Sequence, residues 1–280
     1  MQANSKISGG TGAELPRSNA VKGKLLQLCA EFFCFRTDDA AELLRGHPIT
    51  ESDARSVRRT LSILHRDGFL YRVSYFDPGH VRGGACYVYG LSDKGVDHAF
   101  RNGYATAATK TFDEHSIRTL DHELELTSFH IAIYRLCSAR GLPYLWRQTD
   151  LKHTVYPDGF FYVADPANPG KAFCYFLEIE RAKLGNYRNG EPQILRKLRK
   201  YYEYFNSTDC EKEWGFRHYR VIVVQRNDAR REGLLRALRE TINHRMFWLT
   251  TESAYREDLA GAIFMTPKDD AQVPFSFLMR

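Results

Sequence analysis

Apolar residues in the first part of the chain recur at helical spacing over three separate segments. Residues 21–35 have an apolar side chain at every third or fourth position, which predicts a helix with one buried face. Residues 37–44 predict a short second helix, and residues 53–68 predict a third that stops at its terminal glycine. The buried face of this third helix would consist of Val57, Leu61 and Leu64.

Two strand-like runs follow the third predicted helix. The runs FLYRVSYF (69–76) and ACYVYGL (85–91) are rich in aromatic and β-branched residues, and the proline and glycines between them predict a hairpin turn. A capped helix over 92–103 closes this part of the chain. Three helices followed by a hairpin is the order of a winged helix-turn-helix, so we predict such a domain over residues 20–103.

Basic and polar residues cover the exposed side of the third predicted helix and the tip of the hairpin. In a winged helix the third helix enters the major groove of DNA, and the hairpin lies on the backbone or the minor groove. Two other interpretations stay open: an ordinary solvated helix face, and a winged helix that binds a protein. The residues predicted to contact double-stranded DNA are Arg55, Arg58, Arg59, Ser62, Arg66, His80 and Arg82.

Helical and strand-like segments alternate through the remaining two-thirds of the chain. This order predicts an α/β domain over residues 116–280, with a mixed sheet flanked by helices. Residues 104–115 lose apolar periodicity and predict a linker, and residues 1–19 predict a disordered arm. The helices are expected at 116–141, 191–206 and 228–244, and the strands at 144–148, 157–163, 172–180, 219–225 and 246–251, before a terminal hairpin.

Composition excludes several classes of protein. A hydrophobic content of 43% over 280 residues is enough for two cores, and no apolar run approaches the roughly 18 residues of a membrane span. The six cysteines are far apart and form no Cys-x-x-Cys pair, which argues against a zinc cluster and a disulfide framework. With no signal-peptide pattern at the start, we expect a cytoplasmic protein. The net charge of +6 permits nucleic-acid binding without requiring it.

Acidic residues lie at the ends of the predicted strands between residues 157 and 180. Asp158 is in a Pro-Asp-Gly turn, and Glu178 and Glu180 end an apolar strand on the same face, because strand side chains alternate. Such carboxylates need solvent, a counter-ion or a metal, and three of them together would suit Mg²⁺ or Mn²⁺. Equally open is a surface ion-pair network with Arg181, Lys183 or Arg196.

Other sequence features narrow the chemistry further. The chain has no Gly-x-x-x-x-Gly-Lys-Ser/Thr loop, no Gly-x-Ser-x-Gly elbow and no His-x-Glu motif with paired cysteines. An ATPase, an α/β-hydrolase and a zinc deaminase are therefore not supported. The aromatic residues Tyr201, Tyr202, Tyr204 and Phe205 would either stack on bases or be divided between core packing and ordinary surface.

Five short segments, taken in order, resemble the replication-relaxation family of plasmid and mobile-element proteins. They are YVYGLSDKG, LDHELELTSFHIAI, the PDG turn at 157–159, FLEIERAK at 176–183 and ILRKLRKYYEYF. Through that family the chain is similar to the PD-(D/E)XK nuclease-like superfamily. The resemblance covers most of the chain, from about residue 20 to residue 250, and implies a winged helix followed by a nuclease-like domain.

The resemblance also implies roles for particular residues. Asp158 and Glu178 would bind the metal, and Glu180 stands where the superfamily usually has lysine, as a further ligand or a base. The catalytic positive charge would then come from Lys183 or Lys197, and His122 would be an extra ligand or base.

The implied function is that of a DNA-binding protein of a plasmid or mobile element, acting in replication, DNA relaxation or mobilisation by metal-dependent nicking. The alternative is a non-catalytic DNA-binding regulator or replication accessory factor. Double-stranded DNA is the expected partner. A homodimer, or protein partners in replication or mobilisation, would be compatible with either function.

Overall fold

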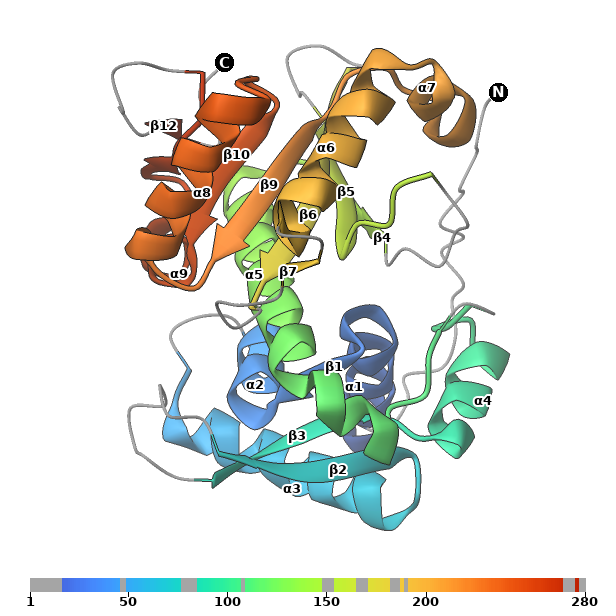
Figure 1. Ribbon diagram of the computed structural model, residues 1–280. Helices are drawn as coiled ribbons and strands as arrows, with labels where there is room; N and C mark the ends of the chain where they lie inside the picture. The colour runs from blue at the N-terminus through green and yellow to red at the C-terminus, as the bar shows by residue number, and fades with distance from the viewer. Residues whose placement is uncertain are drawn as a thin grey trace. The chain divides into compact units, whose positions relative to one another are not determined.

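The structure is a computed structural model of the whole chain (Figure 1). It describes residues 17–45, 49–76, 85–106, 109–147, 154–164, 171–181, 187–188, 191–268 and 275–276. The chain divides into two compact units, Met1–Ile117 and Arg118–Arg280, and each is described by itself.

The first unit combines helices with a small antiparallel sheet. Its strands are β1 (Cys34–Arg36), β2 (Leu70–Phe76) and β3 (Ala85–Leu91), in the order β1-β3-β2. The helix expected over 21–35 ends at Phe32, because Phe33 adopts a positive φ of 61° and the next residues pair with β3 instead. The helices are α1 (Arg17–Phe32), α2 (Thr37–Arg45), α3 (Glu51–Arg66) and α4 (Asp93–Arg101).

Helix α3 begins at a complete capping box. The Thr50 hydroxyl accepts a hydrogen bond from the backbone N–H of Asp53 at 3.1 Å, and the Asp53 carboxylate accepts one from the backbone N–H of Thr50 at 3.3 Å. This arrangement fixes the first turn of the helix. The buried stripe consists of Ala54, Val57, Leu61 and Leu64, which includes the three residues expected from the sequence.

Phe112, in the segment expected to link the domains, packs inside the first unit. Its side chain is fully buried, and its backbone N–H donates to the Leu91 carbonyl at 2.7 Å. Its ring makes an edge contact with Phe33, with centroids 5.7 Å apart. Gly90 lies directly beneath the ring, where a Cβ atom would clash with the Phe112 side chain and lie 2.7 Å from the Phe33 carbonyl. Gly90 is therefore required for this close approach.

The boundary between the units falls within the 3-10 helix η1 (Glu114–Thr119), and the second unit is built on a five-stranded sheet. The sheet order is β10-β9-β6-β5-β4; β6, β9 and β10 are parallel, and β4 and β5 are antiparallel to their neighbours. The strands are β4 (Tyr144–Arg147), β5 (Gly159–Ala164), β6 (Ala172–Glu180), β9 (Arg220–Gln225) and β10 (Phe247–Thr251). The predicted fold class, a mixed α/β fold with a mixed sheet flanked by helices, is confirmed.

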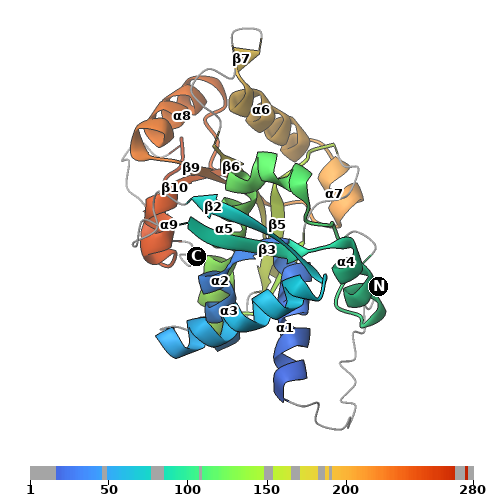
Figure 2. The same ribbon diagram turned by 90° about the horizontal axis from the view of Figure 1, so that it is seen from below.

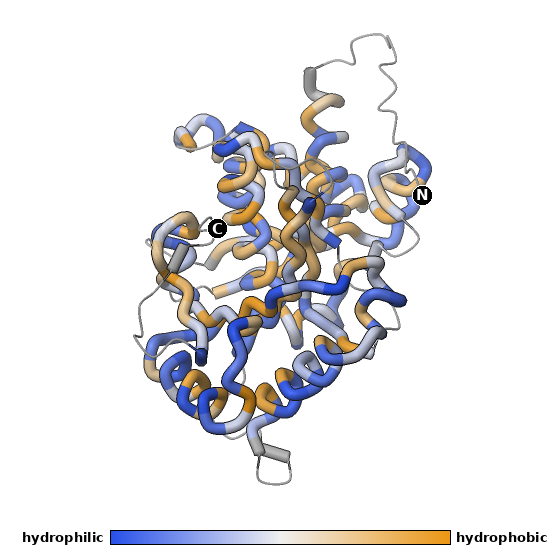
Figure 3. Tube along the Cα trace, turned by 90° about the horizontal axis from the view of Figure 1, so that it is seen from above, coloured by the Kyte–Doolittle hydropathy of each residue, from blue (hydrophilic) through white to orange (hydrophobic). Residues whose placement is uncertain are grey.

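Helices cover both faces of this sheet. One core lies under α6 (Gln193–Asn206) and α8 (Asp228–Thr241), which lie side by side in Figure 2. The second core lies under α5 (Leu120–Arg140) and α9 (Glu252–Asp258). The helices alternate between hydrophilic and hydrophobic residues along the trace in Figure 3, as expected for helices with one face on a sheet. The remaining elements are α7 (Asp209–Trp214) and two short pairs, β7 (Tyr187–Arg188) with β8 (Glu191–Pro192) and β11 (Ala262–Phe264) with β12 (Phe275–Ser276).

The cores also decide between two interpretations of the aromatic residues of α6. Tyr201 and Tyr204 are buried in the core under α6, so their rings pack against protein and are not exposed for stacking on bases. None of the six cysteines, all of which are among the described residues, forms a disulfide; five of them are buried, and Cys86 is half-buried. No helix among the described residues is long and apolar enough to cross a membrane.

Candidate functional site

Asp158 is held against strand β6 by the backbone. Its N–H donates to the Leu177 carbonyl at 3.0 Å, and its carboxylate Oδ2 accepts the N–H of Ile179 at 2.8 Å. The residue after Asp158 must lack a side chain, because a Cβ atom at Gly159 would lie 2.8 Å from the ring of Trp146. The Pro-Asp-Gly turn therefore places the Asp158 carboxylate beside the end of β6.

Glu178 lies on β6 with only 2% of its surface exposed, and its side chain meets helix α6. The Tyr201 hydroxyl donates a hydrogen bond to Glu178 Oε1 at 2.6 Å, and the Lys197 ammonium forms an ion pair with Glu178 Oε2. Lys197 and Tyr201 are four residues apart, so they lie on the same face of α6. A buried carboxylate thus has a partner for each oxygen.

Lys197 also reaches the second carboxylate. Its Nζ lies 3.5 Å from Asp158 Oδ1, so one ammonium contacts both Asp158 and Glu178. The two carboxylates that lie twenty residues apart in the sequence therefore meet at one cation. Of the two lysines considered from the sequence, Lys197 is at this place, whereas Lys183 lies outside the described residues.

His122 completes the site from the first turn of α5. Its Nε2 lies 3.2 Å from Asp158 Oδ2, and its Nδ1 lies 3.6 Å from Glu123 Oε1. The imidazole is partly exposed, with 31% of the side chain accessible. Helix α5, the turn before β5, strand β6 and helix α6 thus bring an imidazole, two carboxylates and an ammonium together. His122, Asp158, Glu178 and Lys197 are called the central cluster below.

The environment shifts the pKa of every member of the central cluster. Burial raises the pKa of Glu178 to about 8, with a further contribution from the Asp158 charge. Burial also disfavours the charged form of Asp158, but the hydrogen bond from His122 and the charge of Lys197 outweigh it and lower the pKa of Asp158.

The two basic groups hold their protons more tightly than usual. Burial lowers the pKa of His122, but hydrogen bonds to Asp158 and Glu123 outweigh it and raise the pKa to about 10. Likewise, burial opposes the charged form of Lys197, but the charges of Glu178 and Asp158 raise its pKa. At neutral pH His122 and Lys197 are therefore cations.

A divalent metal at this place would have two carboxylates as its protein ligands, those of Asp158 and Glu178. The ammonium of Lys197 is a stand-in cation that contacts Asp158 and Glu178 at once. Mg²⁺ in proteins is often bound by one or two carboxylates, with water and phosphate oxygens as the other ligands. Among the described residues no group of three His, Cys, Asp or Glu side chains could hold a metal ion. A metal at this place would therefore replace the Lys197 ammonium between the two carboxylates.

Glu180 ends strand β6 on the same face as Glu178 and is half-buried. Its register partner on the neighbouring parallel strand is Gln225. It lies two residues beyond Glu178, at the carboxyl end of β6.

A second buried ionic cluster, which the sequence interpretation missed, lies on the α5 side of the sheet. Glu125 of α5 has no exposed surface and pairs with Arg181 at 3.1 Å, with Arg256, and with the Tyr255 hydroxyl. Arg181 Nη1 also donates to the Asp121 carbonyl at 3.0 Å. The only sequence signal was the spacing of Asp121 and Glu125 on one helix face; Arg256 is more than a hundred residues away.

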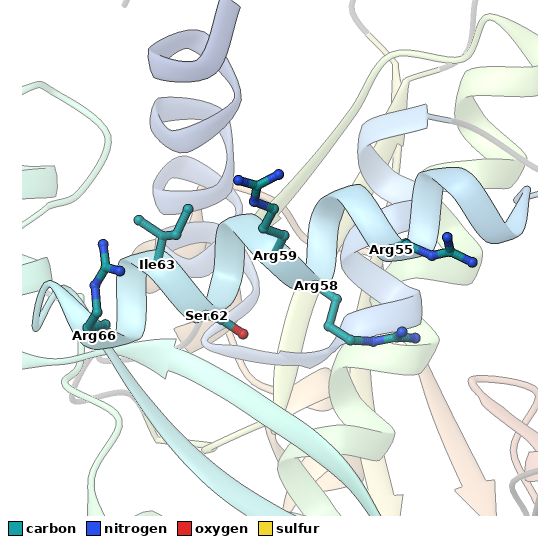
Figure 4. Close-up of a pocket in the computed structure, with 6 residues that line it drawn as sticks. All are labelled: Arg55, Arg58, Arg59, Ser62, Ile63 and Arg66. Atoms are coloured by element: carbon teal, nitrogen blue, oxygen red, sulfur yellow. The ribbon is translucent and has the colours of Figure 1, made fainter.

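The basic residues expected to contact DNA lie on the exposed side of α3. Arg55, Arg58 and Arg59 have no acidic partner among the described residues, whereas Arg66 pairs with Asp67 at 3.3 Å. His80 and Arg82 lie outside the described residues. In Figure 4, Arg59, Ile63 and Arg66 project from one flank of the helix, and Arg58 and Ser62 project from the other. A surface hollow on α3 is lined by Arg55, Arg58, Arg59, Ser62, Ile63 and Arg66.

Comparison with known proteins identifies the family. A family model described as replication-relaxation matches residues 35–218, which span α3, the hairpin, the central cluster and α6. The chain belongs to the replication-relaxation family, as the sequence resemblance predicted. No curated protein and no solved structure matches the chain.

Proposed function

We propose that this protein binds double-stranded DNA of a plasmid or mobile element through its first unit and nicks one strand with its second unit, in replication, relaxation or mobilisation. The observation that carries the proposal is the central cluster: two carboxylates, an ammonium and a protonated imidazole from four elements meet at one place. Membership of the replication-relaxation family supports it.

DNA binding is argued from helix α3 and the hairpin behind it. Three arginines without acidic partners among the described residues leave positive charge available for phosphates. Three helices followed by the β2–β3 hairpin support a winged helix, in which α3 would lie in the major groove. The hairpin presents Tyr87, which is 44% exposed and has the Arg72 guanidinium 4.2 Å from its ring centroid.

Gel shifts over a salt series test this binding. Each phosphate that the protein neutralises contributes about −0.9 to the slope of log affinity against log salt. Arg58→Ala and Arg59→Ala should each make the slope shallower by about one. Arg101→Ala, an exposed arginine at the end of α4, is the control and should leave the slope unchanged. Equal slopes for all variants would rule out α3 as the DNA-binding face.

Nicking is hydrolysis of one phosphodiester. A water oxygen attacks phosphorus and gives up one proton to the surrounding water. The bond from phosphorus to one ester oxygen breaks, and the departing oxygen takes up a proton. A divalent cation bound by Asp158 and Glu178 would neutralise the phosphate and lower the pKa of bound water. The Lys197 ammonium, once off the carboxylates, can contact a phosphate oxygen, and protonated His122 can supply the proton to the departing oxygen.

Conversion of supercoiled plasmid to the open circle with Mg²⁺ or Mn²⁺ tests the chemistry. The wild type should nick, the Asp158→Ala, Glu178→Ala double variant should be inactive, and Lys197→Met should be about a hundredfold slower or worse. Lys200→Met removes an exposed lysine from the same helix and should retain full activity. If the double variant nicks as fast as the wild type, these residues do not carry the reaction.

A second candidate function is a DNA-binding regulator or replication accessory factor without catalysis. The ion pairs of the central cluster favour this second function, because Lys197 and His122 already neutralise the two carboxylates. The glutamate at position 180, where the superfamily usually has lysine, points the same way. Calorimetry with Mn²⁺ separates the two. Binding that Glu178→Gln abolishes supports the enzyme, whereas no binding by a chain that still shifts DNA supports the regulator.

A further inference from the structure

Tyr156, two residues before Asp158, is the most exposed large apolar side chain among the described residues of the second unit. It is 61% exposed, although the residues on either side of it, Val155 and Pro157, are buried. Val155 belongs to the core under α6, so the Tyr156 ring points away from that core. Single exposed apolar side chains are common on protein surfaces. Tyr156 differs from them in how its backbone is held and in what lies beside it.

The backbone around Tyr156 is fixed on both sides. The Glu213 carboxylate of α7 accepts hydrogen bonds from the Thr154 hydroxyl at 2.8 Å and from the Thr154 backbone N–H at 3.2 Å. On the other side, Asp158 is hydrogen-bonded to β6 through its backbone and through its carboxylate. Strands β5 and β6 lie side by side in Figure 1. A ring on an anchored backbone loses little conformational freedom when it binds a ligand.

Tyr156 is also close to the part of the central cluster that solvent reaches. The side chains of Asp158, His122 and Lys197 are each partly exposed, whereas that of Glu178 is buried. Two residues of chain span at most about 7 Å, so the backbone of Tyr156 lies within that distance of Asp158. One nucleotide spans a similar distance. A strand with a phosphate at the central cluster can therefore place a neighbouring base on the Tyr156 ring.

An aromatic side chain stacks on a base only where the face of that base is uncovered. In a double helix each base is stacked between its neighbours, and uncovering it costs free energy. Bases of an unpaired strand have open faces, and proteins that hold such strands stack them on exposed aromatic rings, whatever the sequence. Tyr201 and Tyr204 are buried and cannot do this, whereas Tyr156 is exposed.

We propose that Tyr156 stacks on an unpaired base and thereby positions the strand that the second unit nicks. The substrate of the second unit is then a locally opened strand, as negative supercoiling favours, and not an intact double helix. This inference rests on the proposed function, because it assigns a nucleic-acid strand to the central cluster. Duplex binding by the first unit is compatible with it, because an opened stretch is flanked by duplex.

The test measures binding of a fluorescent single-stranded thymidine oligonucleotide to the full chain without metal. An Arg58→Ala, Arg59→Ala background reduces binding by α3. In this background Tyr156→Ala should weaken binding about tenfold, which is within the range for stacking on one base. Tyr156→Leu keeps an apolar side chain without a ring and should bind as weakly. Tyr156→Phe keeps the ring and should restore the affinity.

Phe173→Ala is the matched control. Phe173 is an aromatic residue of the same unit and is 47% exposed, but it lies five residues before Glu178 on β6, about 16 Å away along the strand. Its removal should leave the affinity for the oligonucleotide unchanged. Melting temperatures of the same samples show that each variant is folded.

A duplex of the same length distinguishes an unpaired base from a paired one. Tyr156→Ala should lose affinity for the single strand and keep its affinity for the duplex. An equal loss for both would mean that the ring contacts the double helix, and would overturn the inference. If neither affinity changes while the wild type still nicks supercoiled plasmid, Tyr156 has no part in binding the strand, and the inference fails alone.

Two results would affect the proposed function itself. If the chain with intact α3 arginines binds neither the single strand nor the duplex at low salt, the proposed function and this inference both fail. If the wild type binds the single strand through Tyr156 but does not nick plasmid with Mg²⁺ or Mn²⁺, the proposed hydrolysis is wrong and the stacking role of Tyr156 is retained.

Discussion

Two effects act in opposite directions on the ionisation of the Glu178 side chain. Burial disfavours its charge, yet Lys197 and Tyr201 are both placed to contact a carboxylate. A pair of this kind adds little net stability, because removing two charges from water offsets most of their attraction. The ion pair with Lys197 instead positions the Glu178 carboxylate next to Asp158, in a strand that is otherwise mostly apolar.

The raised pKa values predict that the protein loses stability as pH rises. Glu178 is protonated more readily in the folded state, so its contribution is complete below its ordinary value of 4.5 and is lost as pH rises through about 8. The His122 contribution is complete below 6.5 and is lost through about 10, in the same direction. The free energy of unfolding should therefore fall between pH 6 and pH 9, when measured by urea denaturation.

Variants assign this pH dependence to residues. Glu178→Gln removes the titrating group while it keeps the size of the side chain, so the fall between pH 6 and pH 9 should become smaller. Glu203→Gln, at an exposed position of the same helix as Lys197, should leave it unchanged. An identical fall in the Glu178 variant would show that another group is responsible.

Between elements, the Glu125 cluster joins α5, the end of β6 and α9. Arg181 directly follows β6 and contacts both Glu125 and the carbonyl of Asp121, the residue before His122. The cluster therefore holds the first turn of α5 at a fixed place beside the strand that carries Glu178. The geometry of the central cluster therefore depends on the Glu125 cluster, which shares no residue with it.

Glu125→Ala should be strongly destabilising. The change leaves the Arg181 and Arg256 guanidinium groups without their shared carboxylate, and breaking a buried ion pair typically costs about 3–5 kcal/mol. The measurement is the free energy of unfolding in urea. Glu257→Ala, an exposed position on α9, is the control and should change it by no more than about 0.5 kcal/mol. A similar small effect for both variants would mean that the cluster does not support the fold.

Long, strongly patterned elements were predictable from the sequence, and short ones were not. The strand expected at 172–180 coincides with β6, because an apolar run of that length fits a buried strand. Strand β1 has three residues and helices α7 and α9 have six and seven, too few for a periodic pattern, and all three were missed.

The same limit applies to the candidate site. Asp158 and Glu178 were candidates from residue type and strand position. Lys197 was a candidate as one of the lysines that follow the acidic strand, and His122 was a candidate through the family resemblance. Which lysine would meet the carboxylates could not be decided, since it depends on how α6 packs on the sheet.

At the scale of the whole molecule, each compact unit supplies its own core. Both hydrophobic clusters of the sheet consist of residues from 126 to 265, all within the second unit. A domain with a complete core folds without its neighbour. The division of labour in the proposed function, with DNA recognition in one unit and hydrolysis in the other, is therefore compatible with separate folding.

The fragment 118–280 should accordingly unfold in one cooperative transition. Near-ultraviolet circular dichroism, which reports fixed aromatic packing, should show the transition in thermal and urea melts. A fragment that begins at residue 134 lacks most of α5, including Phe129 and Glu125 of the second core and its ionic cluster, and should not fold. If both fragments lack a cooperative transition, the second unit depends on the first.

The distribution of the thiols has a practical consequence. Five cysteines are buried, and burial raises the pKa of Cys137 and Cys174 to about 11, so in the native state they resist alkylation. Cys86, in the β2–β3 hairpin, is the one half-buried thiol among the six. The unmodified chain thus offers a single attachment point for an environment-sensitive dye, on strand β3 of the hairpin. The proposed binding of a double helix could be followed from it in real time without engineering a cysteine-free background.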